Sequence, residues 1–235
     1  MITKEDNFLG LTGLKVLVTG ATSGLGFGIS IALAKEGAEL IAIGRDKAQL
    51  EHLSDAIAQT AGSVTLVCLD LAKQGTIEEL SQKIAEKFGT LNIIIHCAMS
   101  SLQMMPISQV SLKEIEVNLL SPITICFRLI SNFHGILCRN PKGLFIYISD
   151  IRMEKFNGPY NSAKKACDQL LLAYQEENKR LGVNVLIQYP EHMETKLRKK
   201  AFPGEKKIGA DVVDKEAQKI IEKILTFTDR ERIIT

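Results

Sequence analysis

The chain has 235 residues, of which 46% are hydrophobic and 24% are charged, a composition typical of globular proteins with a buried core. Its formal net charge of +2 is close to balance, so the whole-chain field favours neither nucleic acid nor a membrane surface as a partner. Residues 1–13 lack a long apolar core, and no later segment has about eighteen consecutive apolar residues. We therefore expect a soluble, cytoplasmic protein.

The cysteines are odd in number, widely spaced and placed mostly in apolar runs, and no C-x-x-C pair occurs. A disulfide framework or a metal site would need paired or closer spacing. We therefore expect no metal site, and buried free thiols at Cys68, Cys97, Cys126, Cys138 and Cys167.

In chain order, an apolar run at 14–18 leads into T-G-A-T-S-G-L-G at 19–26, and a helical pattern follows. A strand, a glycine loop and a helix start are expected here. The glycines let the backbone turn sharply and approach a ligand, and the free amides of a helix start carry partial positive charge. The pattern favours a dinucleotide pyrophosphate as ligand, although glycine in such a turn can also serve packing alone.

Short apolar runs then alternate with longer helical patterns, which is typical of a parallel sheet with helices on both faces. Strands are expected at 39–43, 63–69, 91–95, 143–149 and 183–188, and 232–234 could add a short seventh. Helices are expected after the glycine loop and at 47–59 (capped by Asp46), 76–88, 111–137 (interrupted near Pro122), 160–181 and 211–227. The chain is thus predicted to be one α/β domain over 1–235, a Rossmann-type doubly wound parallel sheet.

Two of these helical segments, 123–130 and 166–174, are apolar on more than one face. A helix on a sheet needs only one apolar stripe, so the second stripe suggests burial against another subunit. The alternative is that both helices are simply central. We expect a homodimer or homotetramer.

Tyr160 and Lys164 lie four residues apart in Y-N-S-A-K on a predicted helix and so share one face. A tyrosine hydroxyl has a reference pKa of about 10, and a nearby ammonium favours the phenolate and can lower that pKa by about 1 to 3. The pair could therefore act in acid–base chemistry. Such a pair also occurs by chance on helix surfaces.

The glycine loop, Asn118, Tyr160 and Lys164, in this order, make the chain resemble the short-chain dehydrogenase/reductase family over nearly its whole length. Asp70-Leu71 follows the third strand, where that family places an Asp near the adenine ring. Asn118 matches the family's helix asparagine, and Pro190 with Thr195 resembles its P-G-x-x-x-T segment.

The resemblance implies hydride transfer between a nicotinamide and a carbonyl or secondary alcohol. Tyr160 would donate a proton to the carbonyl oxygen, and Lys164 would favour the phenolate and hold the nicotinamide ribose. Asn118 would anchor a water that links Lys164 to solvent. General acid–base help of this kind is typically worth about 10² to 10⁴ in rate.

At the end of the second strand of a dinucleotide-binding fold, an acid binds a free ribose hydroxyl, whereas an Arg accommodates a 2′-phosphate. This chain has Gly44-Arg45-Asp46 at that position, and we expect these residues to set the nucleotide preference. Gly44 stands in place of the acid, which favours NADP(H). Ser23, where many NADP-binding relatives have a basic residue, keeps NAD as an alternative. The expected cofactor contacts are Gly20, Thr22, Ser23, Gly24, Leu25, Gly26, Arg45, Asp70, Leu71, Ala98, Tyr160, Lys164, Pro190 and Thr195.

Three segments depart from the family pattern. His96-Cys97-Ala98-Met99 stands where the family has N-N-A-G, with His96 expected to be a packed histidine and Met99 to add bulk. Ser149-Asp150 stands where the family has Ser-Ser; either residue could hold the substrate carbonyl, and Ser149 is favoured because an ionised Asp cannot donate. Glu191 replaces a glycine, and a basic run follows that could meet an acidic substrate or form a solvated helix face: Lys196, Arg198, Lys199, Lys200, Lys206 and Lys207.

The sequence thus favours an NADP(H)-dependent oxidoreductase, with Tyr160, Lys164, Ser149 and Asn118 as catalytic residues and a small carbonyl compound or alcohol as substrate. The alternative is a noncatalytic protein that binds a nucleotide for a structural or regulatory purpose. The altered 96–99 segment and Asp150 motivate that alternative, whereas the retained Asn118, Tyr160 and Lys164 favour the enzyme.

Overall fold

The structure is a computed structural model that describes residues 10–99, 104–140, 143–152, 155–202, 204, 209 and 211–232. Six strands form one parallel sheet in the order β3-β2-β1-β4-β5-β6. This confirms the predicted Rossmann-type α/β fold. Their bounds are β1 Lys15–Thr19, β2 Glu39–Gly44, β3 Ser63–Cys68, β4 Ile93–His96, β5 Leu144–Ile148 and β6 Asn184–Gln188.

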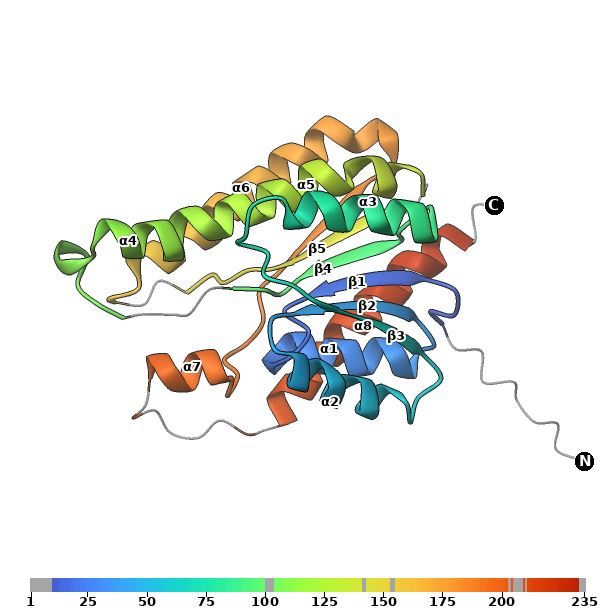
Figure 1. Cartoon of the computed structure of the whole chain (residues 1–235), viewed down its shortest axis with the longest axis horizontal. Coiled ribbons are helices and arrows are strands. Elements are labelled where there is room, and N and C mark those ends of the chain that lie inside the picture. The colour runs from blue at the N-terminus through green and yellow to red at the C-terminus, as the bar shows by residue number, and fades with distance from the viewer. Residues whose placement is uncertain are drawn as a thin grey trace, which may run out of the picture.

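Helices cover both faces of the sheet (Figure 1). Helices α1 (Gly24–Lys35), α2 (Lys47–Ile57) and α8 (Asp211–Arg232) lie on one face, and α3 (Thr76–Phe88), α5 (Ser121–Cys138) and α6 (Gly158–Asn178) lie on the other. Each face has its own core: Val16 and Val18 of β1 belong to the first and Leu17 to the second, as the alternation of a strand requires. The strand order reverses between β1 and β4, which opens a crevice at the carboxyl ends of these strands.

The predicted interruption near Pro122 is confirmed as a change of helix type. A capping box of Ser111 and Glu114 begins α4 (Leu112–Ile115), a π-helical segment follows at Glu116–Leu120, and Pro122 lies in the first turn of α5. Proline has no amide hydrogen and fits a helix start, so the regular ladder restarts there.

Length and composition alone would let the helical run Leu112–Cys138 cross a membrane. Cys126, Leu129 and Phe133 of this run are fully buried in the second core. One face of the run therefore packs against the sheet, as in other helices that cover a sheet. The apolar composition of the run is weak support for a membrane span.

Several boundaries differ from the sequence-based prediction. Asp46 caps α2 as expected, accepting a hydrogen bond from the Gln49 amide at 3.2 Å, but α2 ends at Ile57. The C-terminal helix α8 extends to Arg232, so a seventh strand beginning at that residue is wrong, and 233–234 lie outside the described residues. A short helix, α7 (Lys196–Ala201), forms in the basic run, one of the two readings that the sequence left open for it.

All five cysteines are free, but their surroundings differ. Cys126 and Cys167 are buried between α5, α6 and the sheet, as expected. Cys97 and Cys138 are half-buried, and Cys68 is exposed at the end of β3, so the expected burial is wrong for Cys68.

Candidate active site

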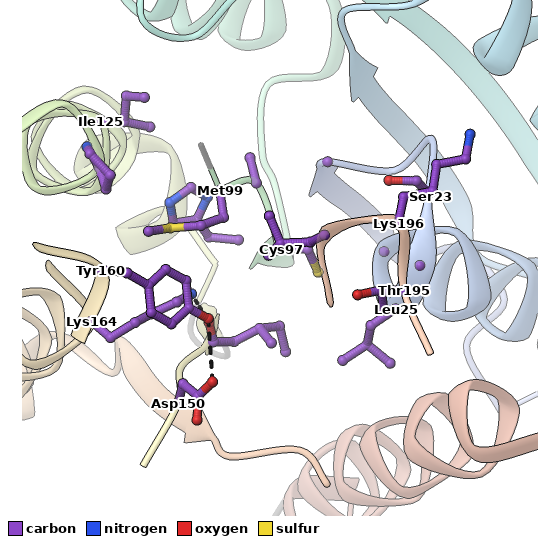
Figure 2. Close-up of a pocket in the computed structure, with 18 of the residues that line it drawn as sticks. Ser23, Leu25, Cys97, Met99, Ile125, Asp150, Tyr160, Lys164, Thr195 and Lys196 are labelled. Carbon is purple, nitrogen blue, oxygen red and sulfur yellow. Dashed lines mark hydrogen bonds between the residues drawn. The ribbon is translucent and has the colours of Figure 1, made fainter. Parts of the chain in front are cut away.

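A cavity of about 650 Å³ lies at the carboxyl edge of the sheet, in the crevice where the strand order reverses (Figure 2). Its walls come from the glycine loop, the ends of β2 to β6, α5, α6 and α7. It brings together every site residue predicted from the sequence except Asn118: Gly20, Thr22, Ser23, Gly24, Leu25, Gly26, Arg45, Asp70, Leu71, Ala98, Ser149, Tyr160, Lys164, Pro190 and Thr195.

The glycine loop is shaped by close backbone packing. Gly20 has a φ of +69°, and a Cβ there would lie 2.8 Å from the Ala98 amide nitrogen. A Cβ on Gly26 would overlap the Gly20 carbonyl. The Ser23 side chain makes no capping hydrogen bond. The Ser23 carbonyl accepts the Phe27 amide in the first backbone hydrogen bond of α1. The Gly24, Leu25 and Gly26 amides of the first turn therefore have no cap from the Ser23 side chain, and these three residues line the cavity.

His96 is packed as the sequence analysis expected. Its Nδ1 lies 2.7 Å from the Thr19 hydroxyl, and its ring stacks on Tyr147 with centroids 5.6 Å apart. Burial, assisted by the charge of Lys164, lowers the pKa of His96 to about 3. His96 is therefore a neutral structural histidine.

The segment after His96 forms part of the cavity wall. The Ala98 amide donates to the Thr19 hydroxyl at 3.2 Å, which ties this segment to β1. Burial raises the pKa of the Cys97 thiol to about 12. Met99 lines the cavity beside these residues, so its bulk enters the site where the family has glycine.

Tyr160 and Lys164 project from the first turns of α6 into the cavity (Figure 2). The buried Lys164 ammonium donates to the Ile148 carbonyl at 2.7 Å and lies over the rings of Tyr147 (4.8 Å) and Tyr160 (5.7 Å). Burial lowers the pKa of Lys164, while nearby groups such as Cys167 and Asp150 oppose that shift. The ammonium thus lies at the sheet edge close to the phenol.

The hydroxyl of Tyr160 donates to Asp150 Oδ2 at 3.4 Å (Figure 2). Arg152 holds both oxygens of the same carboxylate, through Nε and Nη2, each at 2.7 Å. Burial would raise the pKa of Asp150, but the hydrogen bonds and charge of Arg152 bring it below its ordinary value. Asp150 is therefore ionised and paired.

Ser149, which was favoured over Asp150 from the sequence, also lines the cavity. Its amide donates to the Gln188 carbonyl at 2.8 Å, and its hydroxyl is buried without a hydrogen-bond partner in the described part of the chain. Both residues line the cavity, and the Tyr160 hydroxyl donates to the carboxylate of Asp150.

Asn118 lies in the π-helical segment beside the cavity. Its side chain is buried, and its Oδ1 has no hydrogen-bond partner among the residues that the structure describes. Glu116, Val117, Ser121 and Pro122 around it line the cavity, whereas Asn118 itself does not. A π-helical turn of this kind often marks a functional position.

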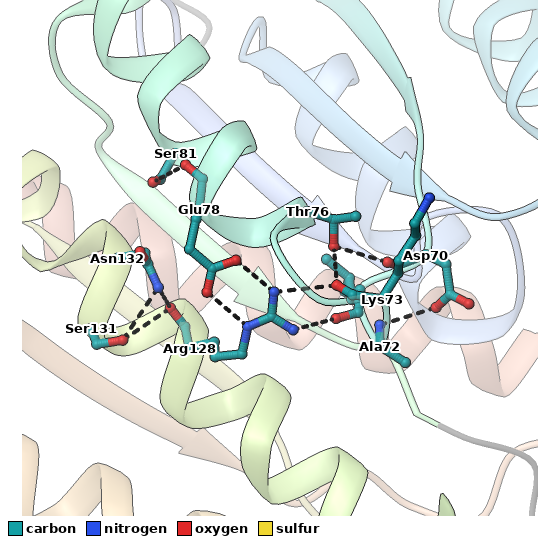
Figure 3. Close-up of polar contacts among 10 residues, drawn as sticks. Asp70, Ala72, Lys73, Thr76, Glu78, Ser81, Arg128, Ser131 and Asn132 are labelled. Atoms are coloured by element: carbon teal, nitrogen blue, oxygen red, sulfur yellow. Dashed lines mark hydrogen bonds and ion pairs between the residues drawn. The ribbon is translucent and has the colours of Figure 1, made fainter.

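The opposite end of the cavity is the loop after β3. Asp70 Oδ1 accepts the Ala72 amide at 3.0 Å, and the Asp70 carbonyl accepts the Thr76 hydroxyl (Figure 3). Arg128 of α5 donates to the Leu71 carbonyl at 3.2 Å and the Lys73 carbonyl at 3.3 Å, so α5 fixes the loop that carries two predicted cofactor contacts.

Thr195 is both a cavity residue and the N-cap of α7, accepting the Arg198 amide at 3.2 Å. A Cβ on Gly24 would lie 3.0 Å from the Thr195 methyl group, so this segment packs on the glycine loop. Of the basic run, Lys199 pairs with Glu194, and Lys206 and Lys207 lie outside the described residues. Other cavity residues that were not predicted as site residues include Ile125, Arg152, Met193, Leu197 and Phe202.

Curated relatives match most of this chain. Dehydrogenase/reductase SDR family member 7B of Mus musculus is 28% identical over 77% of this chain and 58% of its own length. Dehydrogenase/reductase SDR family member 1 of Mus musculus is 25% identical over 83% of this chain and 65% of its own length. The chain thus spans less than two thirds of both relatives.

Solved structures share the fold. An alcohol dehydrogenase from the archaeon Thermococcus sibiricus, complexed with 5-hydroxy-NADP, is 26% identical, with a TM-score of 0.72 over 88% of each chain. A Shigella flexneri protein complexed with NADP is 22% identical, with a TM-score of 0.80 over 89% of this chain and 92% of the other.

The sequence model described as short chain dehydrogenase matches residues 14–206. That range contains all six strands, the glycine loop and the Tyr160–Lys164 pair. This chain is therefore a member of the short chain dehydrogenase family of oxidoreductases.

Proposed function

We propose that the protein is an NADP(H)-dependent oxidoreductase that interconverts a carbonyl compound and a secondary alcohol. The observation that carries this proposal is one cavity that joins the uncapped glycine loop at one end to Tyr160 and Lys164 at the other. A site of this kind suits a dinucleotide that spans the crevice, with its reactive end near the phenol.

The residues present fit the cofactor. The first-turn amides of α1, without a side-chain cap from Ser23, suit an anionic pyrophosphate. Thr195 packs across Gly24 and would help to enclose that group. Asp70 and Leu71 would contact the adenosine half, and Ala98 and Pro190 the nicotinamide half. When bound, the nicotinamide would supply or accept the hydride.

Tyr160 is the proposed general acid for reduction and general base for oxidation. The Lys164 ammonium favours the phenolate that remains after proton donation, and its place at the sheet edge lets it hold the nicotinamide ribose. The buried Oδ1 of Asn118 supports its proposed role of holding a water that resupplies protons through Lys164.

The contact between Asp150 and Tyr160 supports Ser149, rather than Asp150, as the residue that holds the substrate carbonyl. An ionised carboxylate accepts from the Tyr160 hydroxyl and cannot donate to a carbonyl oxygen. Ser149 remains the proposed hydroxyl donor to the substrate carbonyl, because the residue lines the cavity and its buried Oγ has no hydrogen-bond partner among the described residues.

The proposed preference for NADP(H) over NAD(H) depends on Arg45. Arg45 lies directly after β2 and lines the cavity, where its guanidinium can pair with a 2′-phosphate. A Cβ on Gly44 would overlap the Thr22 methyl group, so an acid that reads a free ribose hydroxyl fits poorly at this position.

A noncatalytic nucleotide-binding role is the second candidate. Met99 in the cavity and the carboxylate on the Tyr160 hydroxyl are the observations that favour it. An enzyme is the better-supported proposal because Tyr160, Lys164 and Ser149 all line one cavity.

The proposed assembly is a homo-oligomer joined through α5 and α6, which lie together on one face (Figure 1). Leu120, at the end of the π-helical segment, is exposed, and so are Phe127 on α5 and Leu172 on α6. Large apolar side chains gathered on adjacent helices are typical of a subunit interface.

The proposed reaction is tested with a panel of ketones, aldehydes and secondary alcohols, following the absorbance of reduced cofactor. We expect turnover with at least one carbonyl–alcohol pair and a higher kcat/KM with NADPH than with NADH. Tight NADP binding with no turnover across the panel would instead favour the noncatalytic role.

A further inference from the structure

Arg152 lines the cavity and has a guanidinium donor without a hydrogen-bond partner among the described residues. A guanidinium has five N–H donors in a fixed plane. Arg152 uses one edge, Nε and Nη2, on Asp150. Its Nη1 is buried and has no hydrogen-bond partner in the part of the chain that the structure describes. A buried donor without a partner costs free energy, so a ligand that accepts from the Nη1–Nη2 edge is favoured.

This edge lies beside the proposed proton donor. Asp150 Oδ2 accepts from Arg152 Nη2 at 2.7 Å and from the Tyr160 hydroxyl at 3.4 Å, so one oxygen atom separates the guanidinium from the phenol. A carbonyl oxygen that receives a proton from Tyr160 therefore has Arg152 within reach of a substituent on a neighbouring carbon.

The charges around this edge favour an anion. Asp150 raises the pKa of Arg152, while the nearby charge of Arg198 opposes that rise. Both guanidinium groups line the cavity, and Lys200 lines it as well. A ligand carboxylate at this edge would offset the repulsion between Arg152 and Arg198.

We infer that the substrate is an oxo acid whose carboxylate, one or two carbons from the reacting carbonyl, binds the Nη1–Nη2 edge of Arg152. This inference rests on the proposed function. In the reduction, the carbonyl carbon accepts a hydride with its electron pair from the reduced nicotinamide, and the carbonyl oxygen accepts the Tyr160 proton. The product is the hydroxy acid together with oxidised cofactor. The carboxylate is unchanged and serves as the anchor, through a planar fork that lysine cannot reproduce.

Binding is measured first, apart from turnover. The protein is saturated with NADP⁺ and titrated by calorimetry with pyruvate and acetoacetate, and with their methyl esters, which lack the negative charge at the proposed anchor. Cofactor and ligand are then both oxidised, so no reaction occurs. We expect at least one acid to bind roughly 10- to 100-fold more tightly than its ester.

The test variant is the double substitution Asp150→Asn with Arg152→Met. It removes the guanidinium and does not leave an unpaired carboxylate beside Tyr160. We expect it to abolish the preference for the acid. Arg152→Lys should restore only part of the preference. Lys199→Met is the matched control, because Lys199 pairs with Glu194, lies on α7 and is not a cavity residue. This control should keep the full preference.

Equal binding of acids and esters by the wild type, or an acid preference that survives the double substitution, would overturn the subsite. Either result leaves the proposed function standing if neutral ketones are reduced. Failure to bind or use NADP(H) would overturn the proposed function instead. In that case the acids and esters are titrated into the protein without cofactor. The ratio of the Kd values of ester and acid then tests the Arg152 subsite in the same way.

Discussion

Arg128 on α5 binds Glu78 on α3 with both arms of its guanidinium, Nε to Oε1 at 2.9 Å and Nη2 to Oε2 at 2.6 Å (Figure 3). The Arg128 hydrogen bond lowers the pKa of Glu78 to about 2. Because the same guanidinium also donates to the carbonyls of Leu71 and Lys73, the pair fixes the loop after β3.

Arg128→Met should loosen that loop and weaken binding of NADP, because Asp70 and Leu71 are the proposed contacts to the adenosine half. We expect the Kd for NADP to rise roughly 3- to 10-fold. The Kd for nicotinamide mononucleotide, which lacks that half, should stay close to the wild-type value. Arg139→Met, which removes an exposed arginine that donates to the Gly89 carbonyl, is the control. Equal losses for both ligands would contradict the positioning role.

Much of the fold follows from local sequence. The strands at β1, β4 and β5 are continuous apolar runs because both faces of a parallel sheet are buried. The Asp46 cap of α2 was predictable because it involves residues three apart. The bounds of helix α7 were not predictable in this way, because K-L-R-K-K-A has too few apolar residues for a 3.6-residue period.

The site was predictable where short motifs carry it, as in the glycine loop and the Tyr160–Lys164 pair. Contacts between distant segments were not. Arg128 reaches Leu71 across 57 residues, and nothing local marks it. Asp150 contacts the Tyr160 hydroxyl because of the path that the short segment between β5 and α6 takes. Residue spacing alone cannot determine that path. The D-x-R pattern of Asp150 and Arg152 was the available signal for the ion pair.

Arg45→Ala tests the proposed cofactor preference. Loss of a guanidinium from a 2′-phosphate should raise the Kd for NADP about 10- to 100-fold and leave the Kd for NAD little changed. Calorimetry with both cofactors measures this. Lys83→Ala removes an exposed charge that pairs with Glu79 on α3 and should alter neither Kd. A wild-type protein that binds NAD more tightly than NADP would refute the preference.

Phe127→Glu tests the proposed subunit contact. A charge at the centre of an apolar interface should dissociate the homo-oligomer, because the buried carboxylate would have no partner. Sedimentation should show the wild type as a dimer or tetramer and the variant as a monomer with an unchanged far-UV spectrum. Ile107→Glu places the same charge on an exposed apolar residue outside these helices and serves as the control. A monomeric wild type would rule out this assembly.

His96 should make stability fall with acid. Its folded-state pKa of about 3 lies below the reference 6.5, so the unfolded chain takes up a proton first as pH falls. The stabilisation present above pH 6.5 is therefore lost toward pH 3, by at most about 1.4 kcal/mol per pH unit. Urea unfolding between pH 7.5 and 5 should give a shallower pH slope for His96→Gln than for wild type. Parallel slopes would mean that His96 is not the group responsible.

The most direct measurement compares Tyr160→Phe with Tyr189→Phe, using the best carbonyl substrate of the panel. Both substitutions remove a hydroxyl that donates to a carboxylate, but Tyr189 bonds to Asp168 and is not a cavity residue. We predict that Tyr160→Phe lowers kcat by roughly 10² to 10⁴ and leaves the Kd for NADP close to wild type, while Tyr189→Phe retains turnover. Turnover by Tyr160→Phe within a few-fold of wild type would contradict the account.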